Sequence, residues 1–270
     1  MTREPPPRVL AAFGRTGLVE PVAGGQGTAW RASELVLKPL ESSMSLEELE
    51  WQGAVLDSLT PEGFRVSRLR RALDWSALVD GWCAWELVEG EHRERAWPDV
   101  VAVGERFHAA VASVPRPSFI DRRTDPWAIG DHVAWSELPA DAFSHVKHVP
   151  RLAAALRPIE TSGSQLVHGD LTGNVLFAEG LPPAVIDLSP YWRPLGFASA
   201  VVVGDALLWE GADESLLAAV EHVDSFPQLL LRALIYRAVV DEIFRPDEPE
   251  RVGADDFFAA PVELACSLAQ

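Results

Sequence analysis

The amino-acid sequence predicts an α+β fold, in which a small antiparallel sheet with one helix is followed by a larger, mainly helical part. Three observations support this prediction. Alternating apolar runs on both sides of Asp80–Gly81 are typical of a β-hairpin. Ser45 and Glu48 form a capping box at the start of a helix. From Pro98 onward, apolar residues recur at helical spacing.

Taken in chain order, strands dominate the first part of the prediction and helices dominate the second. Strands are expected at Leu18–Val22, Thr28–Arg31, Glu34–Pro39, Leu73–Val79, Trp82–Val88, Val175–Phe177 and Ala184–Ile186. A short helix or a turn is expected at Pro7–Phe13. Helices are expected at Ser45–Leu59, Pro98–Val114, His132–Leu138, Phe143–Leu156, Ala200–Trp209, Leu229–Phe244 and Pro261–Ala269. The first part therefore holds a five-stranded sheet with one long helix.

The composition is that of an ordinary globular protein with an ample core, at 270 residues with 48% hydrophobic and 23% charged residues. We place its two domains at residues 1–89 and 90–270. No apolar run typical of a secretory peptide follows the N-terminus, and the most apolar stretch, Phe197–Trp209, is too short to cross a membrane. Two distant cysteines, Cys83 and Cys266, are typical of idle thiols in a reduced, cytoplasmic protein.

The formal net charge is −17. This charge disfavours nucleic acid and anionic membrane surfaces as partners, because both carry negative charge themselves. It would favour a cationic substrate, although solubility alone is the preferred explanation of the acidic residues. The net charge therefore does not identify a ligand, and the sequence does not determine the oligomeric state.

A glycine-rich turn followed by a lysine-bearing strand is the first candidate binding feature. Gly25 and Gly27 lie between two predicted strands, where glycine lets the backbone approach a ligand and its amides face a phosphate. A plain hairpin turn explains the same glycines equally well. The next strand, Glu34–Pro39, carries Lys38 among apolar neighbours, so a merely solvated lysine is the weaker interpretation.

The most specific pattern is the stretch Val167–Phe177, in which an aspartate and an asparagine share one tight loop. His168 and Asp170 begin this loop, and Asn174 ends it before a short strand. A second apolar strand delivers Asp187, 17 residues after Asp170. Hard cations prefer carboxylate and amide oxygens, so the set suits a magnesium–nucleotide site with a base beside it. The alternative is a structural turn in which the histidine packs and the acid caps a backbone amide.

This pattern resembles the His-Gly-Asp motif of aminoglycoside phosphotransferases and choline kinases, which are relatives of the protein kinases. The resemblance extends from about Leu18 to Asp205 and implies a bilobal protein-kinase-like fold with the nucleotide between the lobes. It implies that Asp170 is the catalytic base that accepts the proton of an attacking hydroxyl. It also implies that Asn174 and Asp187 bind Mg²⁺.

For the first domain, the resemblance implies a nucleotide site for ATP, with GTP as the alternative. Lys38 would bind the α- and β-phosphates, and the turn with Gly25 and Gly27 would cover them. Backbone groups around Glu86 and Val88, at the connection between the domains, would hydrogen-bond the purine. An ordinary interdomain connection is the other interpretation of that segment.

The kinase-like fold also requires a glutamate from the long helix to pair with Lys38. Glu48 is occupied by the helix cap if the capping box forms, so Glu50 is freer to reach the lysine, and we choose Glu50. Either acid could instead lie on the surface. Two other polar residues, His108 and Asp205, are expected to be structural, and the resemblance places Asp205 behind the catalytic loop.

The sequence departs from the kinase pattern at three places. Kinases place the asparagine five residues after the aspartate, whereas Asp170 and Asn174 are four residues apart. Trp30 stands where a third glycine of the kinase glycine pattern would fall. Finally, Asp187 is followed by the proline-bounded segment Leu188–Pro194, which predicts a rigid ordered turn in place of a mobile activation loop. Arg193 in this segment would bind an anion or form a salt bridge.

The leading interpretation is an ATP- or GTP-dependent, Mg²⁺-requiring phosphotransferase acting on a hydroxyl group of a small molecule, which could be cationic. A Ser/Thr peptide kinase is disfavoured by the missing activation-loop pattern. A nucleotide-binding regulatory protein without turnover, a pseudokinase, is kept open by the shortened loop. The acceptor cannot be identified from fold analogy.

Overall fold

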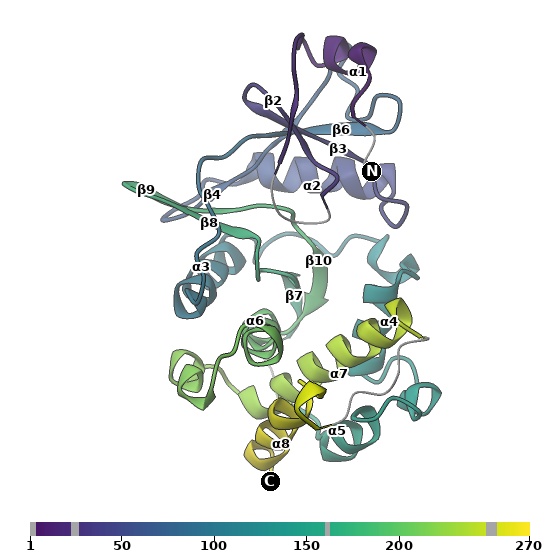
Figure 1. Ribbon diagram of the computed structural model, residues 1–270, viewed down its shortest axis with the longest axis vertical. Helices are drawn as coiled ribbons and strands as arrows, with labels where there is room; N and C mark the ends of the chain where they lie inside the picture. Colours follow the sequence, from purple (N-terminus) through teal and green to yellow (C-terminus); the bar gives the residue numbers. More distant parts are fainter. Residues whose placement is uncertain (1–3, 23–26, 160–162, 247–252) are drawn as a thin grey trace. The chain divides into compact units, whose positions relative to one another are not determined.

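The structure, a computed structural model, describes residues 4–22, 27–159, 163–246 and 253–270. Its α-helices are α1 Pro7–Ala12, α2 Leu46–Ser58, α3 Trp97–Ala110, α4 Pro126–Ala134, α5 Val149–Ala155, α6 Gly196–Trp209, α7 Phe226–Phe244 and α8 Ala259–Leu268. Its strands are β1 Glu20–Pro21, β2 Trp30–Ala32, β3 Leu35–Pro39, β4 Arg65–Val66, β5 Leu69–Arg70, β6 Trp82–Glu86, β7 Gln165–His168, β8 Val175–Ala178, β9 Leu181–Val185 and β10 Pro190–Arg193. Four short 3₁₀ turns also occur in the described ranges. Figure 1 shows these elements along the chain.

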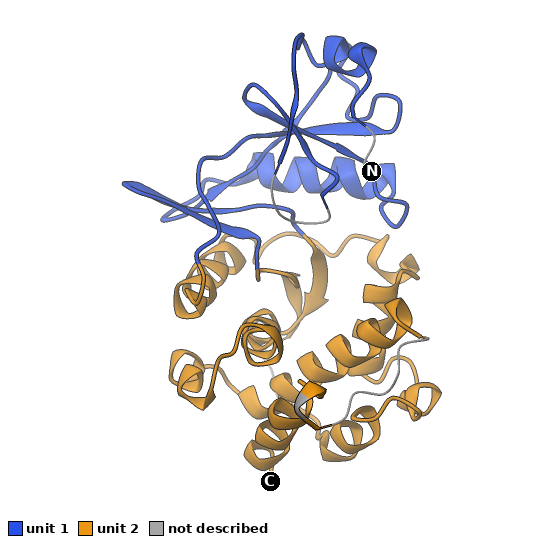
Figure 2. Ribbon diagram, in the orientation of Figure 1, with its two compact units in different colours: residues 1–93, 173–188 blue, residues 94–172, 189–270 orange. Residues whose placement is uncertain are grey.

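The chain forms two compact units (Figure 2). Unit 1 consists of Met1–Arg93 and Gly173–Leu188, and unit 2 consists of Glu94–Thr172 and Ser189–Gln270. A small sheet-containing unit and a mainly helical one confirm the predicted α+β class. No helix in the described part of the chain has the length and apolar character needed to cross a bilayer.

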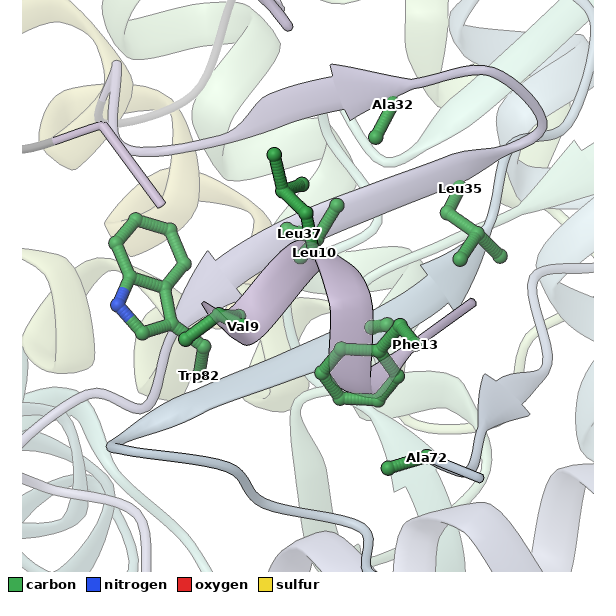
Figure 3. Packing of buried hydrophobic residues seen from close by; sticks show 9 residues of the cluster. Val9, Leu10, Phe13, Ala32, Leu35, Leu37, Ala72 and Trp82 are labelled. Carbon is green, nitrogen blue, oxygen red and sulfur yellow. The ribbon is translucent and has the colours of Figure 1, made fainter. Parts of the chain in front are cut away.

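Unit 1 is built on a five-stranded antiparallel sheet in the order β1-β2-β3-β6-β5. The number of strands and their antiparallel pairing agree with the prediction. Side chains alternate between the faces of a strand, so Leu35 and Leu37 of β3 point to the face that α1 covers with Val9, Leu10 and Phe13 (Figure 3). The opposite face, which includes Cys83, packs on Leu49 of α2. The alternation places Lys38 on the α2 side of the sheet.

The predicted strand Leu73–Val79 is not formed, and the sheet takes β5 at its edge instead. The Asp74 side chain accepts a hydrogen bond from the Ser76 N–H at 3.0 Å, and Trp75 between them has a φ of 70°. This Asx turn competes with extended backbone. The predicted Asp80–Gly81 turn is present, and both of its residues have positive φ, of 50° and 81°.

A second sheet in unit 1 joins distant parts of the chain in the order β4-β9-β8. β8 and β9 form a hairpin, β4 pairs with β9 in parallel, and Glu91 bridges to Phe177 of β8. The predicted division at residues 89 and 90 assigns this hairpin to the C-terminal domain. In the structure the hairpin belongs to unit 1, because its hydrogen-bond partners lie there.

Unit 2 surrounds the two-stranded antiparallel sheet of β7 and β10 with helices. Its central helix, α7, is almost entirely buried and contacts α4, α5, α6 and α8. The sequence predicts a rigid turn after Asp187, whereas Pro190–Arg193 forms strand β10. Its register places Pro190 opposite His168.

Candidate functional site

The predicted catalytic loop follows β7 in unit 2 and is tightly packed. The N–H of Gly169 donates to the carbonyl of Ser189 at 2.9 Å. A Cβ atom at Gly169 would collide with the ring of Tyr191, so only glycine fits between His168 and Asp170 without a shift. The Tyr191 hydroxyl in turn hydrogen-bonds the Tyr236 hydroxyl at 3.1 Å. The loop therefore lies on a strand and helix that fix its backbone.

Two buried histidines hold the same loop. His168 Nδ1 accepts the N–H of Asp170 at 3.2 Å, and the N–H of His168 donates to His108 Nε2 at 3.0 Å. Burial, with a smaller effect of His168, lowers the pKa of His108 to about 3, so the imidazole is neutral and can accept this bond. His108 is thus a packed structural residue, as predicted, and it also supports the loop.

The carboxylate of Asp170 contacts a buried ion pair. Arg237 Nη2 donates to Asp170 Oδ1 at 2.8 Å and to Asp205 Oδ2 at 2.6 Å, while Arg237 Nε donates to Asp205 Oδ1 at 2.7 Å. The side chains of Arg237 and Asp205 are 9% and 2% exposed, and that of Asp170 is 41% exposed. Burial raises the pKa of Asp205, and Arg237 opposes that shift. Asp205 therefore supports the loop through Arg237.

Sequence reasoning found Asp205 but missed Arg237. A signal was present, because Arg237 stands between apolar or aromatic neighbours in residues 233–240, and Asp205 stands in an otherwise apolar helix. A charge buried alone is costly, so two opposite charges in such stretches are a signal that the two residues pair.

In unit 1, the predicted phosphate-binding lysine and one predicted metal ligand come together. Lys38 Nζ forms an ion pair with Asp187 Oδ1, across 149 residues of sequence. Asp187 follows β9 with a φ of 51°, in the left-handed region that aspartate adopts more readily than most residues other than glycine.

The second predicted metal ligand, Asn174, lies at the same end of the hairpin. Its carbonyl accepts the N–H of Ile186 at 3.0 Å, immediately before Asp187. The structure therefore places a residue with an amide side chain and a residue with a carboxylate at the same end of β8–β9. Mg²⁺ is commonly held by one or two carboxylates together with substrate phosphates, so this donor set fits the ion. In the described ranges, no group of three or more His, Cys, Asp or Glu is placed to hold a metal ion.

The predicted pairing of Glu50 with Lys38 is wrong in this structure. Glu50 Oε1 accepts a hydrogen bond from Arg71 Nη1 at 3.0 Å, and this interaction lowers the pKa of Glu50. Arg71 directly follows β5, the strand that packs beside α2, and its fork is a better partner for Glu50 than a lysine already paired with Asp187. The predicted cap does form, since Ser45 Oγ accepts the N–H of Glu48 at 3.1 Å.

The backbone groups predicted to bind a purine differ in the hydrogen bonds that they already form. The N–H of Glu86 donates to the Arg68 carbonyl at 2.8 Å, and the carbonyl of Glu86 accepts the Ser67 hydroxyl at 2.6 Å. A carbonyl has two lone pairs, so the Glu86 oxygen can accept one more bond. Within the described residues, the Val88 N–H and C=O take part in no hydrogen bond.

The glycine turn is only partly described. Gly25 lies outside the described residues. Gly27 has a φ of 67°, and nothing lies within 4 Å of a Cβ built there. Glycine therefore serves backbone conformation at position 27 and does not make room for packing.

Arg193, for which two interpretations were open, forms a salt bridge. Its guanidinium binds both oxygens of Asp131, with the Nη2–Oδ2 distance 2.6 Å, and also reaches Glu137 Oε2 at 2.8 Å. These bonds, against a smaller opposing effect of burial, lower the pKa of Glu137 to about 2. This pair is buried like that of Arg237, but it contacts no residue predicted to belong to the site.

Comparison with known proteins supports the fold through solved structures. No protein-family model matches the chain. No curated protein matches it significantly in sequence.

Three solved structures illustrate the fold. An aminoglycoside phosphotransferase from Alicyclobacillus acidocaldarius matches 100% of this chain and 96% of its own, with a TM-score of 0.63 and 16% identity. A spectinomycin phosphotransferase, in complex with ADP and spectinomycin, matches 93% of this chain and 92% of its own, at a TM-score of 0.57 and 14% identity. The choline kinase LicA from Streptococcus pneumoniae matches 97% of this chain and 96% of its own, at 0.55 and 11%. The chain therefore has the protein-kinase-like fold of these enzymes, which the sequence motif predicted.

Proposed function

We propose that the protein is a phosphotransferase that moves the γ-phosphoryl group of ATP to a hydroxyl group of a small molecule, with GTP as the alternative donor and Mg²⁺ as cofactor. The observation that carries this proposal is the ion pair of Lys38 with Asp187. It joins the lysine that we propose for the phosphates and the acid that we propose for the metal, which are far apart in sequence, on the fold of small-molecule phosphotransferases.

In this proposal the two units supply different groups. Unit 2 supplies Asp170, which accepts the proton of the attacking hydroxyl. Unit 1 supplies Lys38 for the α- and β-phosphates, and Asn174 and Asp187 as protein ligands for Mg²⁺. Bound Mg²⁺ would neutralise charge on the phosphates. Phosphoryl transfer depends mainly on positioning and charge neutralisation, so this small set of groups suffices.

The purine would bind at the backbone beyond β6. The unbonded N–H and C=O of Val88 offer a donor and an acceptor, and the remaining lone pair of the Glu86 carbonyl offers another acceptor. All three are backbone groups, so they suit the edge of a purine whichever side chains stand there. Adenine and guanine present different edges, which makes donor preference directly measurable.

The proposed acceptor is a small molecule with a hydroxyl group, and the net charge of −17 favours one that is cationic. The solved structures of similar fold are named for aminoglycosides, spectinomycin and choline as acceptors.

We further propose that the protein works in the cytoplasm, without a membrane or nucleic acid as partner.

The test is phosphate transfer from labelled ATP or GTP into a pool of metabolites, with the wild type and Asp170→Asn compared. We expect the wild type to label at least one acceptor and the variant to lose turnover by roughly 10²- to 10⁴-fold, which is the usual contribution of a general base. Nucleotide binding should persist in the variant. Absence of nucleotide binding by the wild type would refute the proposal entirely.

A regulatory protein that binds nucleotide without turnover is the second candidate. The spacing of four residues from Asp170 to Asn174 favours it, because kinases use five. Gly173 has a φ of 78°, a conformation that glycine adopts readily, and this tight turn is our reason for ranking catalysis first. Wild-type protein that binds magnesium–ATP and labels no acceptor in broad pools would establish this second candidate.

A further inference from the structure

Arg237 stands at the centre of the most buried charge cluster around the candidate base. It lies in the middle of α7 and is 8% exposed. Its Nε and Nη2 both bond Asp205, as a guanidinium fork bonds a carboxylate. Nη2 carries two hydrogens, and it also bonds Asp170 Oδ1.

The contact with Asp170 exceeds what charge neutralisation inside unit 2 requires. Arg237 and Asp205 already compensate each other with two short bonds, so the buried charges are satisfied without a third partner. The Asp170 side chain is 41% exposed, and water could solvate it at little cost. Arg237 is buried and bonded twice to Asp205, and it still holds the partly exposed carboxylate of Asp170. This additional bond fixes where one oxygen of that carboxylate lies.

We infer that Arg237 is a positioning residue for the proposed base. Asp205 fixes the plane of the guanidinium, and the guanidinium fixes Oδ1 of Asp170 and with it the direction of the other carboxylate oxygen. The inference rests on the proposed function, in which Asp170 accepts the proton of the acceptor hydroxyl. A misplacement of about 1 Å at a reacting group can cost roughly 100-fold in rate.

Other contacts make the anchor itself rigid. The Arg237 guanidinium lies over the rings of Tyr236 and Trp209, with its central carbon 4.8 Å and 5.6 Å from the two ring centroids. The Tyr236 hydroxyl bonds that of Tyr191, which packs on Gly169. The anchor of the carboxylate and the support of the loop backbone thus share one packed group of side chains.

The test removes the anchor without leaving a buried charge unpaired. In the double variant Arg237→Met/Asp205→Leu both charges are absent, so folding should survive. Its matched control is Arg193→Met/Asp131→Leu, which removes a similarly buried pair of unit 2 that does not contact Asp170. For each protein the measurements are the unfolding midpoint, the calorimetric Kd for magnesium–ATP, and kcat and KM for phosphate transfer.

We expect the Arg237→Met/Asp205→Leu protein to keep its nucleotide Kd and lose roughly 100-fold in kcat, while the control keeps both. Wild-type kcat in the first variant, or an equal loss in the control, overturns the inference. If the first variant does not fold, Arg237→Lys replaces it, because lysine keeps the charge and lacks the fork. A wild-type kcat in Arg237→Lys likewise overturns it.

Failure of the proposed function would look different. In that case the wild type itself binds nucleotide and transfers no phosphate, and crystal structures of the wild type and the double variant decide the inference. A single Asp170 orientation on Arg237 that becomes multiple in the variant supports it. An Asp170 side chain with the same single orientation in both proteins overturns it.

Discussion

Charged side chains are held differently in the two units. By the roles proposed for them, we call Asp170 with its partners in unit 2 the base half, and the Lys38–Asp187 pair of unit 1 the nucleotide half. In unit 2, Asp170 is fixed by an arginine and an aspartate that are 9% and 2% exposed. In unit 1, Lys38 and Asp187 pair with side chains that are 25% and 46% exposed. Buried pairs are costly to break, whereas exposed pairs contribute little to stability.

This difference matches what each half would do in phosphate transfer. A base must keep one orientation through the reaction, and the buried anchor of Asp170 provides that. In the proposed reaction, Lys38 and Asp187 would exchange each other for phosphates and Mg²⁺ when a nucleotide binds, and a partly exposed ion pair exchanges partners at low cost. By this proposal the base half would be preorganised, and the nucleotide half would rearrange.

The largest stability effect should come from breaking the buried pair on one side only. Arg237→Met leaves Asp205 unpaired in an apolar helix, and we expect a loss of about 3–5 kcal/mol in the free energy of unfolding. Chemical denaturation measures it. The Arg237→Met/Asp205→Leu double variant is the control and should recover most of the loss. A single variant as stable as the wild type would mean that the base half is not held by this pair.

A second effect should appear as acid sensitivity of the base half. Burial lowers the pKa of His108 to about 3 from its ordinary value of 6.5. The unfolded chain therefore binds a proton below pH 6.5 that the folded protein does not, so stability present above pH 6.5 is lost as the pH falls toward 3. From pH 6.5 to 5 this amounts to about 2 kcal/mol.

The measurement is the difference in unfolding free energy between pH 7 and pH 5 for the wild type and His108→Gln. Glutamine does not titrate, so the variant should show a smaller decrease over this range. Equal decreases in both proteins would assign the acid sensitivity to other groups and would show that His108 is not held neutral beneath the loop.

Mutation in the nucleotide half should change stability little and nucleotide binding strongly, the opposite of what we expect for the base half. Lys38→Met removes an exposed pair, so we expect stability to change by less than about 1 kcal/mol. The Kd for magnesium–ATP should increase clearly, because the phosphates lose their lysine. Calorimetry and denaturation of one sample give both numbers. A large loss of stability with unchanged nucleotide binding would reverse the comparison between the two halves.

The sequence predicted the elements that local chemistry determines and missed those that tertiary pairing decides. The Ser45 cap, the Asp80–Gly81 turn and the sheet of unit 1 follow from spacing and turn residues. An Asx turn forms at Asp74 where hydrophobic alternation predicted a strand. Alternation does not reveal that a side chain will bond the nearby backbone. Pairing of the β8–β9 hairpin with β4 could not be foreseen either, because each contributes only a short run to the sheet.

Within the candidate site, motif spacing located the polar residues, and the partners of those residues depended on long-range packing. Lys38 was identified from its strand, but its pairing with Asp187 needed the hairpin of unit 1. Arg237 carries no motif, and only the cost of burying its charge would have indicated a partner. The partner of Glu50 on the long helix is equally undetermined by sequence, because Arg71, which follows β5, can outcompete Lys38.

The smallest effect is expected at Glu50, which pairs with Arg71 in the structure and not with Lys38 as predicted. Its pair with Arg71 has side chains 40% and 37% exposed, so Glu50→Gln should change stability by less than about 1 kcal/mol and leave the Kd for magnesium–ATP unchanged. Glu48→Gln is the matched variant on the same helix, at a position that is 5% exposed, and should cost more stability. If Glu50→Gln weakened nucleotide binding as much as Lys38→Met, then Glu50 would pair with Lys38 in the nucleotide-bound protein. The exchange of partners proposed for the nucleotide half would then extend to α2.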